Sequence, residues 1–493
     1  MKNNKLILFI VSILALVIVF LWDYFDIGHQ VLIQEDNVPN LFFSKLKEVD
    51  PRPEEYTYND NPVAYAKEDN TFYVSIDLDS LTDEDRELKE AIASGKVFTV
   101  FVQVDLTSYF KSNLIYTGMP LMTMDTLEED AGKFADEDGW KSQICIWNPT
   151  DKDRPYIEDE ASVKYRGATS LNYPKKGMRF HLEDGKYALL GMDEDDDWNM
   201  NALYDDAGLI HNQLSYNLWN QIADNNKIEY DNGIYQEYIE VIIDGQYMGV
   251  YGLQDRYDKK KLHLKSGDIL YKTISGSTPT TPQEVMDWST DIKWPDDWEV
   301  ADYLPICDWF TVFSTRESDY DYACSILDLD QAVDFALFSN MVCGRDNRLK
   351  NIYHICRMND DGTYNFQSLP WDENVTWGQA IADTGVFFTE ENYAYEELPW
   401  DMRTFCNINP VDASELLYMR WLDLREDIIT KDSLENQTAE IYAYLHESGA
   451  YERNYNKWPE SAAGWDDDYI YAFIENRLLY LDEYYSTFYK ENH

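Results

Sequence analysis

Basic residues are scarce in this chain. It holds 41 lysines and arginines against 92 aspartates and glutamates in 493 residues, which gives a net charge of −51. A surface of that sign repels phosphate backbones, so no nucleic-acid partner is expected. Carboxylates on a solvated exterior are the ordinary reason for such a composition, although they also attract cations and basic partners. Basic residues near a candidate site are therefore more informative here than in a typical protein.

Cysteine is also scarce. The six cysteines stand at positions 145, 307, 324, 343, 356 and 406, and none forms a Cys-x-x-Cys pair. This spacing argues against a zinc ribbon or a thioredoxin-like motif, and it does not fix any disulfide pairing. Apolar residues, in contrast, make up 44% of the chain and aromatic residues 15%. That content is ample for a packed core and argues against a disordered chain.

Only one long apolar run occurs in the sequence. Residues 6–22 carry no charge over 17 positions, which is near the short limit for a helix that spans a bilayer. Lys2 and Lys5 precede the run and acidic residues follow it, so the positive-inside rule places the rest of the chain outside the cytoplasm. Because no small-x-small cleavage site follows Trp22, we expect an uncleaved, single-pass signal anchor rather than a cleaved signal peptide.

Three regions are expected along the chain. Residues 1–37 are interpreted as the membrane anchor and a stalk, residues 38–118 as a small mixed α/β accessory region, and residues 119–485 as the main domain. No internal repeat is apparent. In the accessory region, the apolar patterns predict strands at 72–76 and 97–104 and a helix at 83–94.

The main domain is predicted to begin with strands and to end with helices. Its first half reads as strands at 161–165 and 177–182, a helix at 207–223, and a hairpin of 238–243 and 246–253 around an Asp-Gly turn. Residues 274–320 are interpreted as an insertion or irregular connection. The second half reads as helices at 331–343, 414–446 and 467–488 with one hairpin of 352–357 and 364–369. The order of the first half occurs in the small lobe of protein kinases, and in other folds as well.

The polar residues around this last hairpin indicate a type of reaction. Asp346 is followed by Asn351, and Asp372 comes 21 residues after that amide. A carboxylate, an amide and a later carboxylate in this order are the parts of a protein-kinase active site, where they accept the hydroxyl proton and hold Mg²⁺. Mg²⁺ is a hard cation and prefers carboxylate and amide oxygens. The spacing alone is unspecific, and ordinary polar residues at strand ends are the alternative.

Two earlier segments supply candidates for phosphate binding. The stretch from Arg166 to Ser170 follows a strand, and a turn of glycine and small hydroxyl residues can direct backbone N–H groups at phosphates. Lys175 and Lys176 enter the next strand. If the alternation of that strand extends back to these positions, Lys176 shares the apolar face with Phe180 and is the better candidate for a phosphate contact. An ordinary turn and a surface lysine are the alternatives.

The hairpin is followed by a further candidate. Asp255 stands just after its second strand, which in a kinase is the connection between the lobes where the adenine and the ribose bind. A charged residue at the exit of a strand is the alternative.

At these residues the sequence resembles the CotH kinase family, named for spore-coat protein H. The similarity runs from about residue 119 to 485. The motifs that carry it are Arg-Gly-x-Thr-Ser at 166–170, Lys-Lys at 175–176, Asp-Trp-Asn at 197–199, the Gly-x-Tyr-x-Gly-x-Tyr hairpin at 245–251 and Pro-Trp-Asp at 370–372 followed by Gly378. The chain departs from the family pattern at Asp255, where Glu is usual, at Asn374, where Asp is frequent, and at His211, where Arg is frequent.

The resemblance implies an α+β, atypical protein-kinase-like fold of two lobes, with a β-rich N-lobe and a mostly helical C-lobe. The implied activity transfers the γ-phosphate of ATP to serine or threonine of a protein substrate with Mg²⁺ or Mn²⁺, in a spore-coat or cell-surface setting. The implied catalytic residues are Asp346, Lys176 and Asp372. The implied nucleotide-binding residues are Arg166, Ser170, Lys176 and Asp255, and the metal ligands are Asn351 and Asp372.

Two alternatives remain open at this point. A surface structural or adhesion protein that keeps the fold and has lost catalysis would agree with a location outside the cytoplasm, where ATP is scarce. A carbohydrate-active or carbohydrate-binding protein would agree with the 15 tryptophans and many carboxylates, although no local pair of carboxylates stands out. The oligomeric state cannot be predicted.

Overall fold

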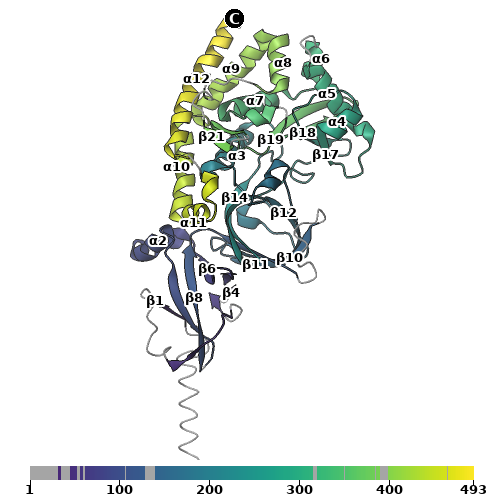
Figure 1. Cartoon of the computed structure of the whole chain (residues 1–493). Coiled ribbons are helices and arrows are strands. Elements are labelled where there is room, and N and C mark those ends of the chain that lie inside the picture. Colours follow the sequence, from purple (N-terminus) through teal and green to yellow (C-terminus); the bar gives the residue numbers. More distant parts are fainter. Residues whose placement is uncertain are drawn as a thin grey trace, which may run out of the picture.

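The computed structural model describes most of the chain after the predicted anchor (Figure 1). It describes residues 31–34, 45–52, 56–58, 61–105, 107–127, 139–314, 319–348, 350–382, 385–388, 393, 398–462 and 465–493. The predicted anchor at residues 6–22 lies outside these ranges. Within them, no helix has both the length and the apolar character that crossing a membrane requires.

The N-terminal part of the described chain is a mixed sheet with one short helix. The sheet has the order β1 (Val31–Gln34), β7 (Phe98–Gln103), β8 (Ser108–Thr117), β6 (Thr71–Ser75) and β5 (Ala64–Ala66), and β2 (Lys47–Glu48) also pairs with β8. β3 (Thr57–Tyr58) and β4 (Asn61–Pro62) form a separate pair, and α2 is Arg86–Ala93. The two predicted strands and the predicted helix of this region are confirmed. Its core is its own, built on residues such as Phe72, Val100 and Leu114.

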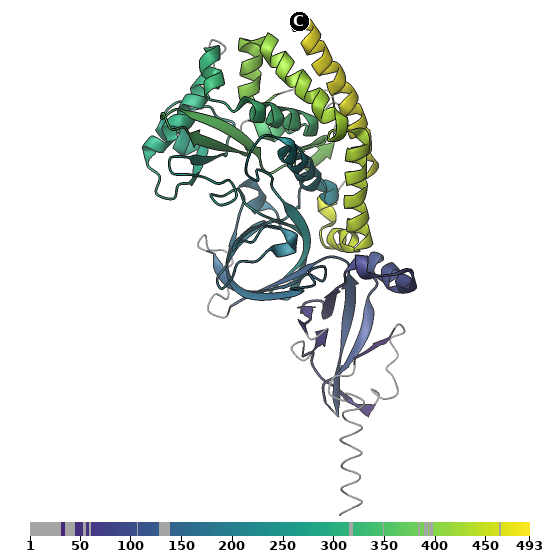
Figure 2. The ribbon, with the colours of Figure 1, turned by 180° about the vertical axis from the view of Figure 1, so that it is seen from behind.

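The next part is a closed barrel, which is seen nearly end-on in Figure 2. Its strands follow the order β10 (Trp140–Trp147), β11 (Tyr156–Tyr165), β12 (Met178–Leu182), β13 (Asp197–Asn201), β15 (Gln246–Gln254), β14 (Gln236–Ile243) and β9 (Leu121–Thr126). β14 and β15 are the predicted hairpin. Asp244 and Gly245 have positive φ angles of 47° and 77°, as a two-residue type I′ turn requires. Phe180, Trp198 and Leu253 are among the apolar side chains that fill the barrel.

A second sheet lies between the barrel and the C-terminal helices. Its order is β17 (Thr290–Trp294), β16 (Ile269–Thr273), β18 (Ile352–Met358) and β19 (Tyr364–Pro370). The hairpin of β18 and β19 was predicted, but β16 and β17 were not. The prediction of an irregular connection over 274–320 is wrong, because this segment holds α4 (Pro282–Trp288), β17 and α5 (Leu304–Ser314). Its threonines and prolines were read as loop residues, yet Thr281 caps α4 and Pro282 occupies its first turn.

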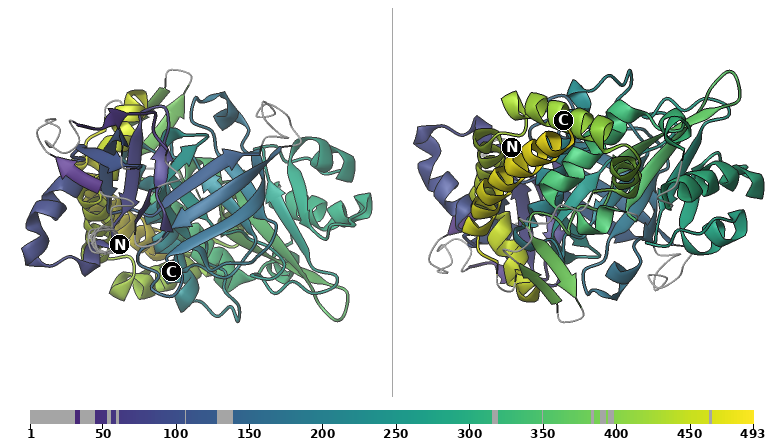
Figure 3. Two further views of the ribbon diagram at one scale, coloured as in Figure 1. Left: turned by 90° about the horizontal axis from the view of Figure 1, so that it is seen from below. Right: turned by 90° about the horizontal axis from the view of Figure 1, so that it is seen from above.

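Helices cover the second sheet and enclose the largest apolar core. They are α3 (His211–Asn225), α6 (Tyr320–Ser325), α7 (Leu329–Val342), α8 (Trp400–Ile408), α9 (Pro410–Asp427), α10 (Lys431–Glu447), α11 (Ala450–Lys457) and α12 (Asp468–Asn492). A two-stranded sheet of β20 (Gln379–Ala382) and β21 (Gly385–Phe388) adjoins them. The predicted helix at 414–446 is two helices, because Thr430 caps a new one by accepting from the Ser433 N–H at 3.0 Å. The view from above in Figure 3 shows α12, in yellow, running across the helical part to the C-terminus.

One buried ion pair joins the three parts of the structure. Arg453 of α11 donates through Nε and Nη2 to the Glu240 carboxylate of β14, both at 2.8 Å. Its Nη2 also donates to the Thr117 hydroxyl at the end of β8, at 2.5 Å. Glu240 is fully buried, so one charged contact links the C-terminal helices, the barrel and the N-terminal sheet. Figure 1 shows α11, which carries Arg453, where these three parts meet.

Candidate active site

A cleft of about 420 Å³ lies between the barrel and the second sheet. From the barrel side, the turn after β11 and the segment after β13 line it. From the other side, side chains at the ends of β18 and β19 line it. Of the predicted site residues, Arg166, Ser170, Asp346, Asn351 and Asp372 line this cleft, and Asp205, Lys350 and Asn374 lie there with them.

The β18–β19 hairpin explains why two of these residues meet. Ile352 at the start of β18 pairs with Pro370 at the end of β19, so Asn351 and Asp372 leave the same end of the hairpin. Both residues have left-handed backbones, with φ angles of 57° and 63°. Asparagine and aspartate adopt this conformation more readily than other residues with a Cβ, so these residue types suit the two turns.

Asp346 lies in a short 3₁₀ turn, Arg345–Arg348, after α7. Its carboxylate is 2.6 Å from the Lys350 ammonium, and both side chains are partly exposed to the cleft. The neighbouring Asn347 is buried and holds the turn in place, because its Nδ2 donates to the Trp371 carbonyl at 2.8 Å and to the Glu373 carboxyl at 2.7 Å. No sequence pattern indicated that Asn347 links these two segments.

Asp205 was not predicted as a ligand, yet it faces the same cleft. Burial by the walls of the cleft, and then repulsion from Asp372, raise the pKa of Asp205 to about 7, while the Asn374 amide donates a hydrogen bond to it. Among the described residues, neither Asp205 nor Asp372 forms an ion pair with a basic side chain. Two carboxylates that repel each other beside two amides are a suitable oxygen set for a hard divalent cation.

The residue that follows Asp372 carries a buried carboxyl group. Glu373 is fully buried, and burial followed by repulsion from Asp372 raises the pKa of Glu373 well above its usual value. Its backbone N–H donates to the Asn212 amide oxygen at 2.9 Å. Asn212 is in turn held by the Asp206 carboxylate, which accepts from its Nδ2 at 2.9 Å. The start of α3 therefore positions the segment that carries Asp372.

The turn after β11 is shaped by one glycine. Gly167 has a φ of 119°, and a Cβ on it would lie 2.1 Å from the Ser170 hydroxyl. Arg166 donates to the Asn201 side-chain oxygen, and its guanidinium lies 5.4 Å from the centroid of the Trp371 ring. Arg166 and Ser170 are therefore placed in the cleft as the sequence predicted.

The structure does not bring Lys176 into the cleft. β12 begins only at Met178, so the alternation that was expected to turn Lys176 inward does not extend to it. The Lys176 ammonium donates to the carbonyls of Leu171 and Tyr173. Lys175 is the buried lysine of the pair, and it donates to the Val250 carbonyl and to Asn454.

Asp255 is also outside the cleft. Its carboxylate is buried, pairs with Lys261 at 2.7 Å and accepts from the Tyr235 N–H at 2.9 Å. Burial raises the pKa of Asp255 to about 6, although Lys261 opposes the shift. In this structure the Asp255 side chain stabilises the end of β15 through its contacts with Lys261 and Tyr235.

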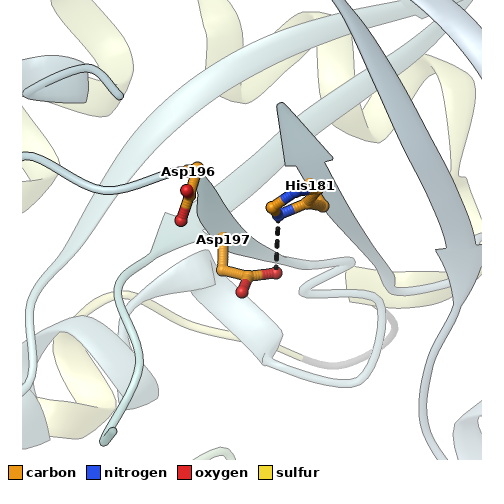
Figure 4. A group of neighbouring side chains, drawn as sticks. All are labelled: His181, Asp196 and Asp197. Carbon is orange, nitrogen blue, oxygen red and sulfur yellow. Dashed lines mark ion pairs between the residues drawn. The ribbon is translucent and has the colours of Figure 1, made fainter. Parts of the chain in front are cut away.

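A second group of possible metal ligands lies on the barrel. His181, Asp196 and Asp197 place one ligand atom each within 4.8 Å of one another (Figure 4). Both carboxylates already have cations, since Lys186 is 2.7 Å from Asp196 and Arg256 is 3.1 Å from Asp197. We therefore interpret this group as surface ion pairs.

A larger hollow of about 580 Å³ lies between α3, α7 and α9. Its two cations are already paired, Lys227 with Asp330 at 2.6 Å and Arg420 with Asp334 at 2.7 Å. None of the predicted site residues lines it, so the predicted chemistry belongs to the smaller cleft.

Comparison with known proteins identifies the family of the chain. The model of one protein family, described as CotH kinase protein, matches residues 163–481. The match covers more than half of the chain and includes every residue of the cleft described above. No curated protein matches the chain.

Proposed function

The chain belongs to the CotH kinase family, and on that premise we propose that it is an atypical protein kinase. It transfers the γ-phosphate of ATP to serine or threonine hydroxyls of a protein substrate, and the barrel and the helical part serve as its two lobes. The observation that supports this most strongly is the meeting of Asp346, Asn351 and Asp372 in one cleft, opposite the turn that carries Arg166.

In this proposal Asp346 is the base. Its carboxylate accepts the proton of the substrate hydroxyl while that oxygen attacks the γ-phosphorus. The bond between the γ-phosphorus and the bridging oxygen breaks, and ADP leaves with the electron pair. Lys350, 2.6 Å from Asp346, keeps this carboxylate in position and adds positive charge beside the transferred group.

The residues opposite Asp346 fit a divalent cation. Asp372 and Asp205 supply carboxylate oxygens, and Asn351 and Asn374 supply amide oxygens, which is the donor set that Mg²⁺ or Mn²⁺ prefers. When bound, the ion neutralises charge on the phosphate oxygens. Glu373 and Asn212 fix the backbone beside Asp372, so the ligands are held before the cation arrives.

We also propose a location for this activity. Residues 6–22 anchor the chain in a membrane, and the basic residues before them orient the kinase domain away from the cytoplasm. The setting is a cell surface or a spore compartment. Protease added outside sealed cells is expected to cleave the domain, and full protection until the cells are lysed would contradict this orientation.

The test of the kinase activity is the transfer of labelled γ-phosphate by the full-length protein in detergent. Casein serves as acceptor, with Mg²⁺ or Mn²⁺ added or removed by chelation. We expect metal-dependent label that is lost in Asp372→Asn, which removes one charge at a backbone position that asparagine tolerates. The matched control is Asp360→Asn, an exposed residue at the other end of the same hairpin. No label from the wild-type protein would contradict the proposal and favour a surface structural protein that keeps the fold.

A further inference from the structure

Lys272 is a partly buried lysine that the sequence did not single out. It lies on β16, opposite Tyr353 of β18. Its ammonium is 4.9 Å from the centroid of the Trp371 ring and 5.6 Å from that of Tyr353. Among the described residues, Lys272 has no hydrogen bond and no ion pair with a carboxylate. The carboxylates of Asp372 and Asp291 act on Lys272 from a distance and raise its pKa, but its ammonium is held by the two rings rather than by a direct ion pair.

A second cation lies over the same tryptophan. The guanidinium of Arg166 is 5.4 Å from the centroid of the Trp371 ring, and it donates a hydrogen bond to the neutral amide of Asn201. Burial, and then repulsion from Arg166, lower the pKa of Lys272 to about 8. Two cations that repel each other at one ring are stabilised when an anion lies between them.

This pair of cations adjoins the proposed catalytic residues. Trp371 directly precedes Asp372, and Thr273, which follows Lys272, accepts the Asn351 N–H at 3.0 Å. Arg166 lines the cleft, as does Ile274, two residues after Lys272. An anion bound by Lys272 and Arg166 is therefore next to the carboxylates that suit a divalent cation.

We propose that Lys272 and Arg166 form the binding site for the phosphate chain of the nucleotide, the role expected from the sequence for Lys176. This inference rests on the proposed kinase function. The ligand class is a linear polyphosphate, because two separated cations beside a divalent cation site match several consecutive phosphates rather than one. Both cations lie over the Trp371 indole, which keeps them close to each other.

The test measures binding to the full-length protein by calorimetry in the presence of Mg²⁺. The ligands are ATP, inorganic tripolyphosphate and adenosine. Lys272→Met keeps the aliphatic stem between the rings and removes the charge. Lys176→Met is the matched control, at a lysine that contacts the turn beside it and the Tyr165 ring. We expect Lys272→Met to weaken the binding of ATP and of tripolyphosphate by roughly 10- to 100-fold, the loss typical of a charge-assisted hydrogen bond. Adenosine binding is expected to stay unchanged, and Lys272→Arg is expected to restore most of the affinity.

The results of these binding measurements distinguish this inference from the proposed kinase function. Wild-type ATP binding that Lys272→Met leaves intact would overturn the inference and leave the kinase proposal standing. Tripolyphosphate binding that depends on Lys272, without any ATP binding, would support the anion site and contradict the kinase. Binding of neither ligand would overturn both.

A second measurement needs no variant. Tripolyphosphate is expected to protect Lys272 of the wild-type protein from reductive methylation, as followed by mass spectrometry, while Lys176 reacts at an unchanged rate. Equal methylation of Lys272 with and without tripolyphosphate would overturn the inference even if Lys272→Met does not fold.

Discussion

The barrel and the second sheet form opposite walls of one cleft, and they differ in how their charged groups are used. On the barrel, Lys175 donates to Val250 and Asn454, and Asp255 pairs with Lys261. On the second sheet, Lys272 and Asp372 have no ion-pair partner among the described residues. The comparison indicates that the barrel mainly gives structural support and that the end of the second sheet carries the chemistry, with Arg166 as the main contribution from the barrel.

The largest expected effect comes from comparing Asp346, in the cleft, with Asp255, on the barrel side. Asp346→Asn should lower phosphoryl transfer by roughly 10²- to 10⁴-fold, the usual contribution of a general base, while ATP still binds. Asp255→Asn, on the barrel side, should lower thermal stability and leave the turnover of the folded protein nearly unchanged. Transfer assays and ATP titrations on both variants check this. A larger loss of turnover in Asp255→Asn than in Asp346→Asn would reverse the roles of the two walls.

The next effect concerns the buried lysine of the barrel. Lys175→Met leaves the Val250 carbonyl without its donor, so we expect a destabilisation of about 1–3 kcal/mol. Lys176→Met should change stability by less than about 0.5 kcal/mol, as is usual for surface substitutions. Denaturant unfolding of both variants measures the difference. An equal response of the two would mean that Lys175 is not a structural element of the barrel.

A third prediction concerns a buried histidine of the second sheet. His354 is buried against Trp309 and Phe366, and burial lowers the pKa of His354 to about 3. Because the unfolded chain binds this proton more readily, stability should fall as the pH drops from about 6.5 towards 3, by at most about 1.4 kcal/mol per pH unit. His354→Phe keeps the aromatic packing and should remove this part of the slope in unfolding experiments. His181→Asn, at an exposed histidine of the barrel, is the control substitution.

The smallest expected effect lies on the outer surface of the barrel. Asp197→Asn removes the surface ion pairs with Arg256 and His181, and such pairs each contribute less than about 1 kcal/mol. The variant should therefore unfold close to the wild type, and the rise in melting temperature with added Mg²⁺ should be the same in both. A rise that disappears in Asp197→Asn would show that the barrel cluster, rather than the cleft, holds the cation.

The parts of the site that the sequence predicted are those that local pairing determines. Asn351 and Asp372 flank a hairpin whose strands were recognised, so their proximity follows from its register. The family motifs added Arg166 and Ser170 to the same cleft. The domain limits and the roles of these residues remain predictions.

The parts that the sequence did not predict depend on contacts between distant segments. Asp205 lines the cleft and Lys272 lies over the Trp371 ring beside it, because the barrel packs on a sheet whose strand β16 was not recognised. Lys176 was assigned to the interior by extending an alternation two residues beyond the start of β12. Asn347 looked like a polar residue between two candidates, and only the folded chain shows that it contacts Trp371 and Glu373.

The buried pair of Arg453 and Glu240 has a consequence for the order of synthesis. Arg453 follows Glu240 by 213 residues and Thr117 by 336. At translation rates of about 5–20 residues per second, roughly 10 to 40 s pass between the appearance of Glu240 and that of its partner. Ile239 and Val241 fill the interior of the barrel, so Glu240 between them lies on its outer face, and its carboxylate stays in water until α11 supplies the counter-charge. The junction of the barrel with the N-terminal sheet is therefore expected to be completed only after α11 appears. Nascent chains arrested before α11 should be cleaved by proteases at this junction more readily than chains arrested after it.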